Sequence, residues 1–208
     1  MHFGRQLDKL EFEEVLAFAG EKGYDSKNVL GGITMKREVN LWDYAGKILE
    51  ATSKGVLLTT KCDGKVNTMT IGWGTLGIEW GKPICTVFVR QSRYTKQFLD
   101  KTGVFTVNVP LDGCDKNILA VCGSKSGRDM DKVEELGLTL EEGETVDVPG
   151  IRQLPLTLEC KVIYQQDQEL SAIEEGCRNR YYKAGTKDDG DFHTAYYGLV
   201  TKAYIIEE

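Results

Sequence analysis

The sequence has little histidine and no closely paired cysteines. Its only histidines among 208 residues are His2 and His193, and none of its six cysteines forms a C-x-x-C pair. Metal sites in proteins are commonly built from closely spaced cysteine and histidine ligands, so the sequence predicts no metal site. The chain length and the expected compartment favour free thiols over disulfides. A redox role for Cys122, which lies in a stretch rich in glycine and serine, is the alternative.

Long apolar runs are absent as well. No stretch is long enough to span a bilayer, and charged residues interrupt the first 30 positions, where a signal peptide would need an apolar core. We therefore expect a cytoplasmic protein with no membrane partner. The formal net charge of −6 argues against nucleic-acid binding, which requires a basic face. It leaves room for a local basic pocket.

Many short strand-like segments and few helices predict a mainly β fold with appended helices. Because the strands do not alternate regularly with helices, a sandwich or barrel is favoured over a parallel α/β sheet. The length fits a single domain over residues 1–208, with an N-terminal helical extension (1–40) and a core (41–208). The predicted helices are 8–19, 41–52 and 93–101, with a helical turn around 114–122. The predicted strands are 56–60, 66–71, 83–89, 104–109, 156–164 and 196–206.

One motif is misleading. Residues 72–77 read Gly-Trp-Gly-Thr-Leu-Gly and match the dinucleotide-binding pattern G-x-G-x-x-G. That pattern works only where a helix begins and offers its N–H groups to a pyrophosphate. Gly81 and Pro83 follow too closely for a helix. These glycines are therefore interpreted as letting the chain turn and letting its backbone approach something flat.

A run of positive charge follows. Between Gly81 and Leu99 the sequence has four cations and no acid; the cations are Lys82, Arg90, Arg93 and Lys96. Ser92 stands where an N-cap would precede a helix starting at Arg93, and a helix N-terminus with hydroxyls and an arginine is typical of a phosphate site. A solvated basic turn is the alternative.

Polar residues at the end of the preceding strand suit the edge of a planar ring. The segment 67–70 supplies one amide and two hydroxyls beside a flexible glycine turn. Met69 or Trp73 could cover a face of such a ring. For Trp73 alone, packing in the core is the alternative.

These segments resemble the flavin reductase-like family, and its flavoredoxin-like members in particular. The resemblance spans about residues 41–205 and rests on four blocks in order. The blocks are Asn67-Thr68-Met69-Thr70-Ile71-Gly72-Trp73, Val89-Arg90-Gln91-Ser92-Arg93-Tyr94-Thr95, Phe105-Thr106-Val107-Asn108-Val109-Pro110, and Cys122-Gly123-Ser124 with Ser126-Gly127-Arg128-Asp129 and Asp131-Lys132.

The resemblance implies an FMN-binding split β-barrel that forms a homodimer with flavin at the interface. It places residues 67–70 and the following turn against the flavin ring, and the turn after Arg90 around the phosphate. The loop 124–132 would close over the flavin, from the same chain or from the partner subunit. The implied cofactor-binding residues are Asn67, Thr68, Met69, Thr70, Trp73, Arg90, Ser92, Arg93, Tyr94, Thr95, Ser124 and Lys132.

The expected function is an FMN-binding oxidoreductase that passes electrons from NAD(P)H through FMN to an acceptor. Since the cofactor supplies the redox chemistry, no catalytic side chain is expected. The first alternative is a flavoredoxin-type carrier that a redox-protein partner reduces. A weaker one is a non-redox module for another ligand, such as haem or pyridoxal phosphate. His193 lies in a polar segment and is expected at the surface, with a contact at the mouth of the flavin site as the alternative.

Overall fold

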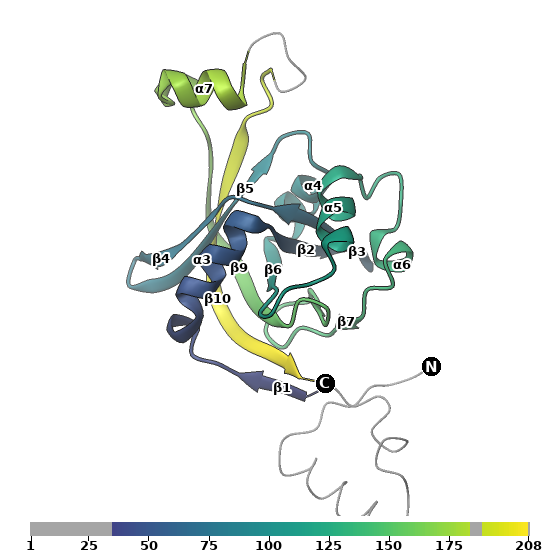
Figure 1. Ribbon diagram of the computed structural model, residues 1–208. Helices are drawn as coiled ribbons and strands as arrows, with labels where there is room; N and C mark the ends of the chain where they lie inside the picture. The colour runs from purple at the N-terminus through teal and green to yellow at the C-terminus, as the bar shows by residue number, and fades with distance from the viewer. Residues whose placement is uncertain (1–34, 184–188, 208) are drawn as a thin grey trace, which may run out of the picture.

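The computed structural model describes residues 35–183 and 189–207. The predicted helix 8–19 lies outside these ranges. The main elements are one curved sheet, a small two-stranded sheet and short helices (Figure 1). The strands are β1 (Met35–Glu38), β2 (Val56–Cys62), β3 (Lys65–Ile71), β4 (Gly74–Glu79), β5 (Lys82–Arg90), β6 (Val104–Val109), β7 (Leu140–Glu141), β8 (Gly150–Ile151), β9 (Leu156–Asp167) and β10 (His193–Glu207). The helices are η1 (Leu41–Tyr44), α3 (Ala45–Lys54), α4 (Tyr94–Thr102), α5 (Lys116–Ser124), α6 (Lys132–Glu135), η2 (Leu170–Ala172) and α7 (Glu175–Tyr181).

The large sheet is antiparallel throughout its described pairs. Its order is β3-β2-β6-β9-β10-β5-β4, and β1 pairs with the far end of β10. Register shifts in the β9–β10 pair, after Tyr197 and after Val200, mark irregularities at which strands bend. Gly198 lies at the first of these, and a Cβ there would stand 2.5 Å from the ring of Phe105. The predicted mainly β architecture is confirmed.

Strand β6 shows how both faces of the sheet are covered. Phe105, Val107 and Val109 pack into the main core, as their alternation predicts. The intervening polar residues are buried too, because the segment leading into β8 covers them. Thr106 Oγ1 donates to Pro149 O at 2.8 Å, and Ile151 N donates to Asn108 Oδ1 at 2.9 Å. The polar face of the strand thus carries hydrogen bonds, as buried polar groups require.

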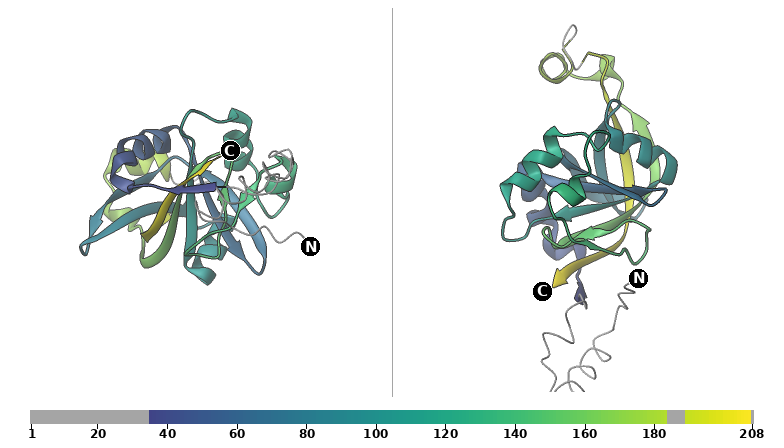
Figure 2. Two further views of the ribbon diagram at one scale, coloured as in Figure 1. Left: turned by 90° about the horizontal axis from the view of Figure 1, so that it is seen from below. Right: turned by 90° about the vertical axis from the view of Figure 1, so that its right-hand side faces the viewer.

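Helices α4 and α5 pack against β2 and β3, the end of the sheet that carries the predicted site. Strands β9 and β10 extend beyond the body, and α7 lies at the end of this extension (Figure 1 and the right-hand view of Figure 2). We call residues 163–183 and 189–193 the arm. The base of the arm returns to the body at His193, which pairs with Arg90 of β5.

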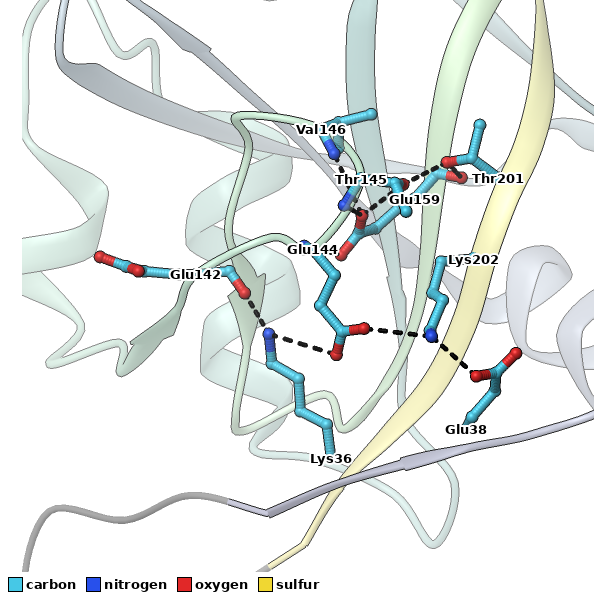
Figure 3. A network of polar contacts seen from close by, with 9 residues as sticks. All are labelled: Lys36, Glu38, Glu142, Glu144, Thr145, Val146, Glu159, Thr201 and Lys202. Atoms are coloured by element: carbon cyan, nitrogen blue, oxygen red, sulfur yellow. Dashed lines mark hydrogen bonds and ion pairs between the residues drawn. The ribbon is translucent and has the colours of Figure 1, made fainter. Parts of the chain in front are cut away.

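A buried carboxylate anchors the loop between β7 and β8 (Figure 3). Glu159 is fully buried on β9 and accepts hydrogen bonds from the backbone of Glu144, Thr145 and Val146 at 2.6–3.2 Å. Outside this contact, the Glu144 carboxylate pairs with Lys202 at 3.2 Å. The network fixes the loop to β9 and β10, which lie between the edge strands β3 and β4 of the large sheet.

Several boundaries differ from those predicted. Residues 35–38 were placed in a helical extension, but they form β1 and complete the sheet along β10. The glycine-rich 74–79 segment was predicted only as a turn, but it forms strand β4 in a hairpin with β5. No helix starts there, so the rejection of the dinucleotide motif is confirmed. Among the described residues, no helix is long and apolar enough to cross a membrane.

Candidate functional site

The predicted site residues gather along strand β3, where two pockets adjoin. We call them the phosphate-end pocket, with a volume of about 130 Å³, and the ring-end pocket, of about 210 Å³. Met69, Thr70 and Arg93 border both pockets, so the two form one groove. Eleven of the twelve predicted residues line it; they are Asn67, Met69, Thr70, Trp73, Arg90, Ser92, Arg93, Tyr94, Thr95, Ser124 and Lys132.

Thr68 is the residue that does not line the groove. Its side chain is fully buried against β2, on the same face of β3 as Thr70, which lies farther along the strand and does line the groove. Its hydroxyl accepts from Thr59 Oγ1 at 3.0 Å and donates to Leu58 O at 3.4 Å. This side chain therefore holds β3 to β2 and lies away from any ligand in the groove.

The phosphate-end pocket is strongly basic. Its lining contains four cations and no acid; the cations are Arg93, Lys125, Arg128 and Lys132. In a chain of net charge −6, this concentration of positive charge favours an anionic ligand. Ser124 and Lys132 reach the pocket from the same chain, so this protomer needs no partner subunit to supply them.

None of these four cations has a carboxylate partner among the described residues, and Lys132 differs from the other three in being buried. Lys132 is only 5% exposed, and its Nζ donates to the carbonyl oxygens of Lys125 and Cys122 at 3.2 and 3.5 Å. Burial lowers the pKa of Lys132, and the charge of Arg93 lowers it further. Arg93 is exposed at the pocket, and its guanidinium bonds to no described side chain. A bound anion would compensate the buried charge of Lys132 and would pair with the exposed charge of Arg93.

Helix α4 begins one residue later than predicted. Its N-cap is Arg93, which makes no side-chain capping bond, so the prediction of Ser92 as the N-cap is wrong. The donors of Ser92 are engaged elsewhere. Its backbone N–H and its hydroxyl both donate to the carboxylate of Asp191, at 2.8 and 2.7 Å. The turn before α4 is thereby tied to the arm.

An unsatisfied oxygen lies in the wall of the phosphate-end pocket. Asn67 donates from Nδ2 to Thr95 Oγ1 at 2.8 Å, but its buried Oδ1 has no hydrogen-bond partner. Gly127 lies against this amide so closely that a Cβ would stand 2.0 Å from Oδ1. Buried polar atoms are almost always paired, so Asn67 Oδ1 is an unmet acceptor beside the pocket.

The ring-end pocket is aromatic. Trp73 is 40% exposed and lies over His193 with ring centroids 4.9 Å apart, so the interpretation of Trp73 as a core residue is wrong. His193 is only 7% exposed and lines the pocket, which overturns its expected surface position. Burial and the neighbouring charge of Arg90 lower the pKa of His193 to about 4. The imidazole is therefore neutral near pH 7.

The arm holds His193 in place. Tyr182 Oη contacts His193 Nδ1 at 2.5 Å and donates to Gln168 Oε1 at 2.8 Å. Since the tyrosine has one proton and gives it to Gln168, the imidazole donates from Nδ1, and its Nε2 is left as an acceptor. Arg90 donates to the carbonyl oxygens of Tyr181 and Asp191, both at 3.0 Å. Arg90 therefore orders the arm as well as lining the pocket.

Other lining residues were missed as site residues. Lys125, Gly127 and Arg128 lie inside or beside the fourth sequence block, so position in that block was the available signal. Arg128 donates to Ser92 O at 3.1 Å and lies over Tyr94 at 5.1 Å. Nothing in the local sequence indicates the contact of Asp191, because it joins segments 99 residues apart.

The cysteines do not form a reactive centre. All six are free, as expected. Cys122 lies in helix α5 and is 2% exposed, not in an open loop. Its burial raises the pKa of the thiol, which disfavours the reactive thiolate. A redox role for Cys122 is therefore not supported.

Residues 50–208 match the family model described as the flavin reductase like domain. The chain belongs to the flavin reductase-like family. The flavoredoxin from Methanosarcina acetivorans has a similar structure, with a TM-score of 0.57 and 27% identity over 74% of this chain and 68% of that one. The flavoredoxin of Desulfovibrio vulgaris (Miyazaki F) has a TM-score of 0.54 and 25% identity over 73% and 68%.

A curated relative comes from Archaeoglobus fulgidus. This uncharacterized protein is 34% identical over 99 residues, which are 48% of this chain. The match spans 55% of that relative's length.

The groove has the chemistry that FMN requires. Its basic end, with four cations and no acid, suits a phosphate. The unpaired Oδ1 of Asn67 and the side-chain-free surface of Gly127 suit a polar ligand in close contact with the wall. The aromatic end suits a planar ring. The residues present therefore fit the cofactor of this flavin reductase-like fold.

Proposed function

We propose that the protein binds FMN in the groove along β3 and passes electrons from NAD(P)H to an acceptor. The observation that carries the proposal is the phosphate-end pocket, whose four cations face no acid in an acidic chain. Arg93 and Lys132 would hold the phosphate, and Ser124, whose hydroxyl donates to Ala120 O at 2.8 Å, would line its pocket. Met69, Thr70 and Trp73 would lie along the ring.

When bound, FMN supplies the redox chemistry, accepting a hydride and releasing electrons singly or in pairs. The side chains of this protein would bind, orient and shield it. His193 is neutral and presents Nε2 as an acceptor at the ring end, so it can accept a hydrogen bond there without adding charge. Trp73 covers His193 and limits the access of water to it.

We also propose a homodimer with the flavin site at its interface. The support is that the ring end borders exposed aromatic surface, including Trp73, which a second subunit could cover. Sedimentation at several protein concentrations tests this. A protein that remains a monomer at all concentrations while holding FMN would contradict it.

The first test is FMN binding itself. Purified protein should show, or gain on incubation with FMN, the visible absorbance of a bound flavin. Replacing Arg93 with glutamine should weaken FMN binding by about tenfold to a hundredfold, because a charge-assisted bond to the phosphate is lost. Gln97→Glu is the matched control, because it makes the same change in net charge at an exposed position of α4 outside the groove. Equal effects of the two variants would contradict the placement of the phosphate.

The second candidate function is a flavoredoxin-type electron carrier reduced by a redox-protein partner. Two flavoredoxins among the similar structures and the net charge of −6 favour it, since negative charge suits docking to a basic partner. Anaerobic stopped-flow mixing separates the candidates. Rapid loss of flavin absorbance with NADH or NADPH supports the reductase. Inertness to both, with reduction by a redox protein, supports the carrier.

A further inference from the structure

A third pocket lies outside the cofactor groove, beside the Gly72-Trp73-Gly74 turn. It has a volume of about 390 Å³, and we call it the outer pocket. Gly72, Trp73 and Phe88 border both this pocket and the ring-end pocket, so the two adjoin. Gly72 and Gly74 of the misleading dinucleotide motif therefore line the outer pocket. FMN bound in the groove does not explain why this pocket is there.

The outer pocket carries no charge. None of its lining residues is ionisable, and Leu49, Trp73 and Phe88 give it an apolar surface. A carboxylate or phosphate placed here would lose water without gaining a cation, which is unfavourable. The contrast with the four cations of the phosphate-end pocket is clear. The chemistry of the lining selects an uncharged ligand and disfavours the pyrophosphate of a dinucleotide.

The glycines of the turn bring α3 close to it. A Cβ on Gly74 would stand 3.2 Å from Thr86 O and 3.5 Å from Thr52 Cγ2, so a side chain here would crowd the Thr86 carbonyl and be in ordinary contact with Thr52. A Cβ on Gly72 would meet only Thr52 O, at 3.8 Å. The wall between Trp73 and α3 is thus bare backbone, which a flat molecule can approach closely.

The hydroxyls of the pocket cannot donate to a ligand without losing a bond. Thr52 Oγ1 donates to Ile48 O, and Ser53 Oγ donates to Glu50 O, each at 2.7 Å. Both are helical back-bonds that use the hydroxyl proton. A ligand can therefore donate a hydrogen bond to these oxygens but cannot accept one from them. A ligand that needs a donor must find it elsewhere in the pocket.

Gln168 supplies such a donor. Its Oε1 already accepts from Tyr182 at 2.8 Å, and its Nε2 donates to no described residue. The indole N–H of Trp73 also has no described acceptor. Both groups can donate to an oxygen of a ligand, and an uncharged carbonyl oxygen suits them.

We propose that the outer pocket binds an uncharged, flat organic molecule bearing an acceptor oxygen, such as an aromatic carbonyl or quinone-like compound, and that this molecule is the electron acceptor. It would take two electrons, supplied by NAD(P)H through FMN, and two protons from water, so that its C=O becomes C–OH. The acceptor role rests on the proposed function, because electrons reach the molecule only if FMN occupies the adjoining groove. The binding step rests on the pocket alone.

Acetophenone is a suitable probe, with benzoate as its charged analogue and ethylbenzene as the analogue without an oxygen. Binding to the full-length protein is measured by saturation-transfer NMR titration, with and without FMN. Acetophenone should bind at least about tenfold more tightly than either analogue, the difference expected for one unpaired polar group or charge. Benzoate binding as tightly as acetophenone, or no saturation transfer to acetophenone, would overturn the proposal.

Matched variants locate the binding. Leu49→Asp puts a carboxylate on the exposed rim and should weaken acetophenone binding by at least about tenfold. Gly46→Asp makes the same charge change on the same helix, in open space outside the pocket, and should have no effect. Gln168→Leu should weaken acetophenone but not ethylbenzene. Equal responses of Leu49→Asp and Gly46→Asp would place the probe elsewhere and refute the assignment.

The same samples separate this inference from the proposed function. If FMN binds and acetophenone does not, the outer pocket assignment fails and the FMN proposal stands. If acetophenone binds at Leu49 and FMN does not bind, the acceptor role and the FMN proposal both fail. If Leu49→Asp changes the sedimenting mass and leaves acetophenone binding intact, a second subunit covers the pocket and the inference is wrong.

Discussion

Ser92 gives both of its donors to one carboxylate, that of Asp191, although 99 residues separate them in the chain. The backbone N–H bonds at 2.8 Å and the hydroxyl at 2.7 Å. This pair joins the turn before α4 to the arm beside the phosphate-end pocket, which Ser92 lines. It also satisfies the donors that the sequence assigned to a phosphate.

We expect Ser92→Ala and Asp191→Ala to destabilise the protein by about 1–3 kcal/mol each, because charge-assisted hydrogen bonds are lost. The double variant should cost less than the sum, since both changes remove one interaction. Urea unfolding of the four proteins measures this coupling. FMN affinity of Ser92→Ala should stay within about threefold of the original. A loss of FMN affinity of about tenfold or more would show that Ser92 contacts the phosphate.

Lys132 should strengthen FMN binding but lower the free energy of unfolding of the protein without FMN. Its ammonium is buried against two carbonyl oxygens without a carboxylate partner among the described residues. Lys132→Met keeps most of the side-chain length and removes the buried charge. We expect a higher free energy of unfolding without FMN, and FMN binding weaker by about tenfold or more. Lys116→Met, on an exposed position of α5, is the control. Unchanged FMN affinity would exclude Lys132 from the site.

Gly127→Ala should close the phosphate-end pocket. The new Cβ would stand 2.0 Å from Asn67 Oδ1 and 3.1 Å from the Tyr94 ring, so the loop must move. We expect destabilisation of about 1–3 kcal/mol and loss of FMN binding. Gly77→Ala is the control, because a Cβ there meets no atom within 4 Å. Thermal unfolding and FMN titration measure both effects. Retention of normal affinity in Gly127→Ala would mean that the cofactor does not use this wall.

The local sequence predicted most of the sheet because apolar periodicity and turn residues act within a strand. Strand β6 has the predicted bounds, and the hairpin at Asp63-Gly64 joins β2 to β3. Strand β4 escaped prediction because it is half exposed and contains two glycines, so it lacks an alternating apolar signal. Strand β1 was missed because its only partner is the far end of β10.

The sequence identified most of the residues that line the groove, but it did not predict the contacts that some of them make. Eleven residues line the groove, but Ser92 and Arg90 spend their donors on the arm. Those contacts depend on how β9 and β10 fold back, which no local pattern encodes. His193 was misplaced for the same reason. Its polar neighbours suggest exposure, whereas Trp73 and Tyr182 bury it from other elements.

His193 should make stability depend on pH in a defined window. Burial lowers its pKa to about 4, whereas the ordinary value of 6.5 applies in the unfolded chain. As pH falls below 6.5, the unfolded state therefore binds the proton first, and the folded state loses up to about 3 kcal/mol by pH 4. Urea unfolding between pH 7 and pH 4 should show this loss in the original protein. The difference between it and His193→Gln, whose side chain does not titrate, should shrink as the pH falls. A constant difference across this range would show that the imidazole is not held neutral by the fold.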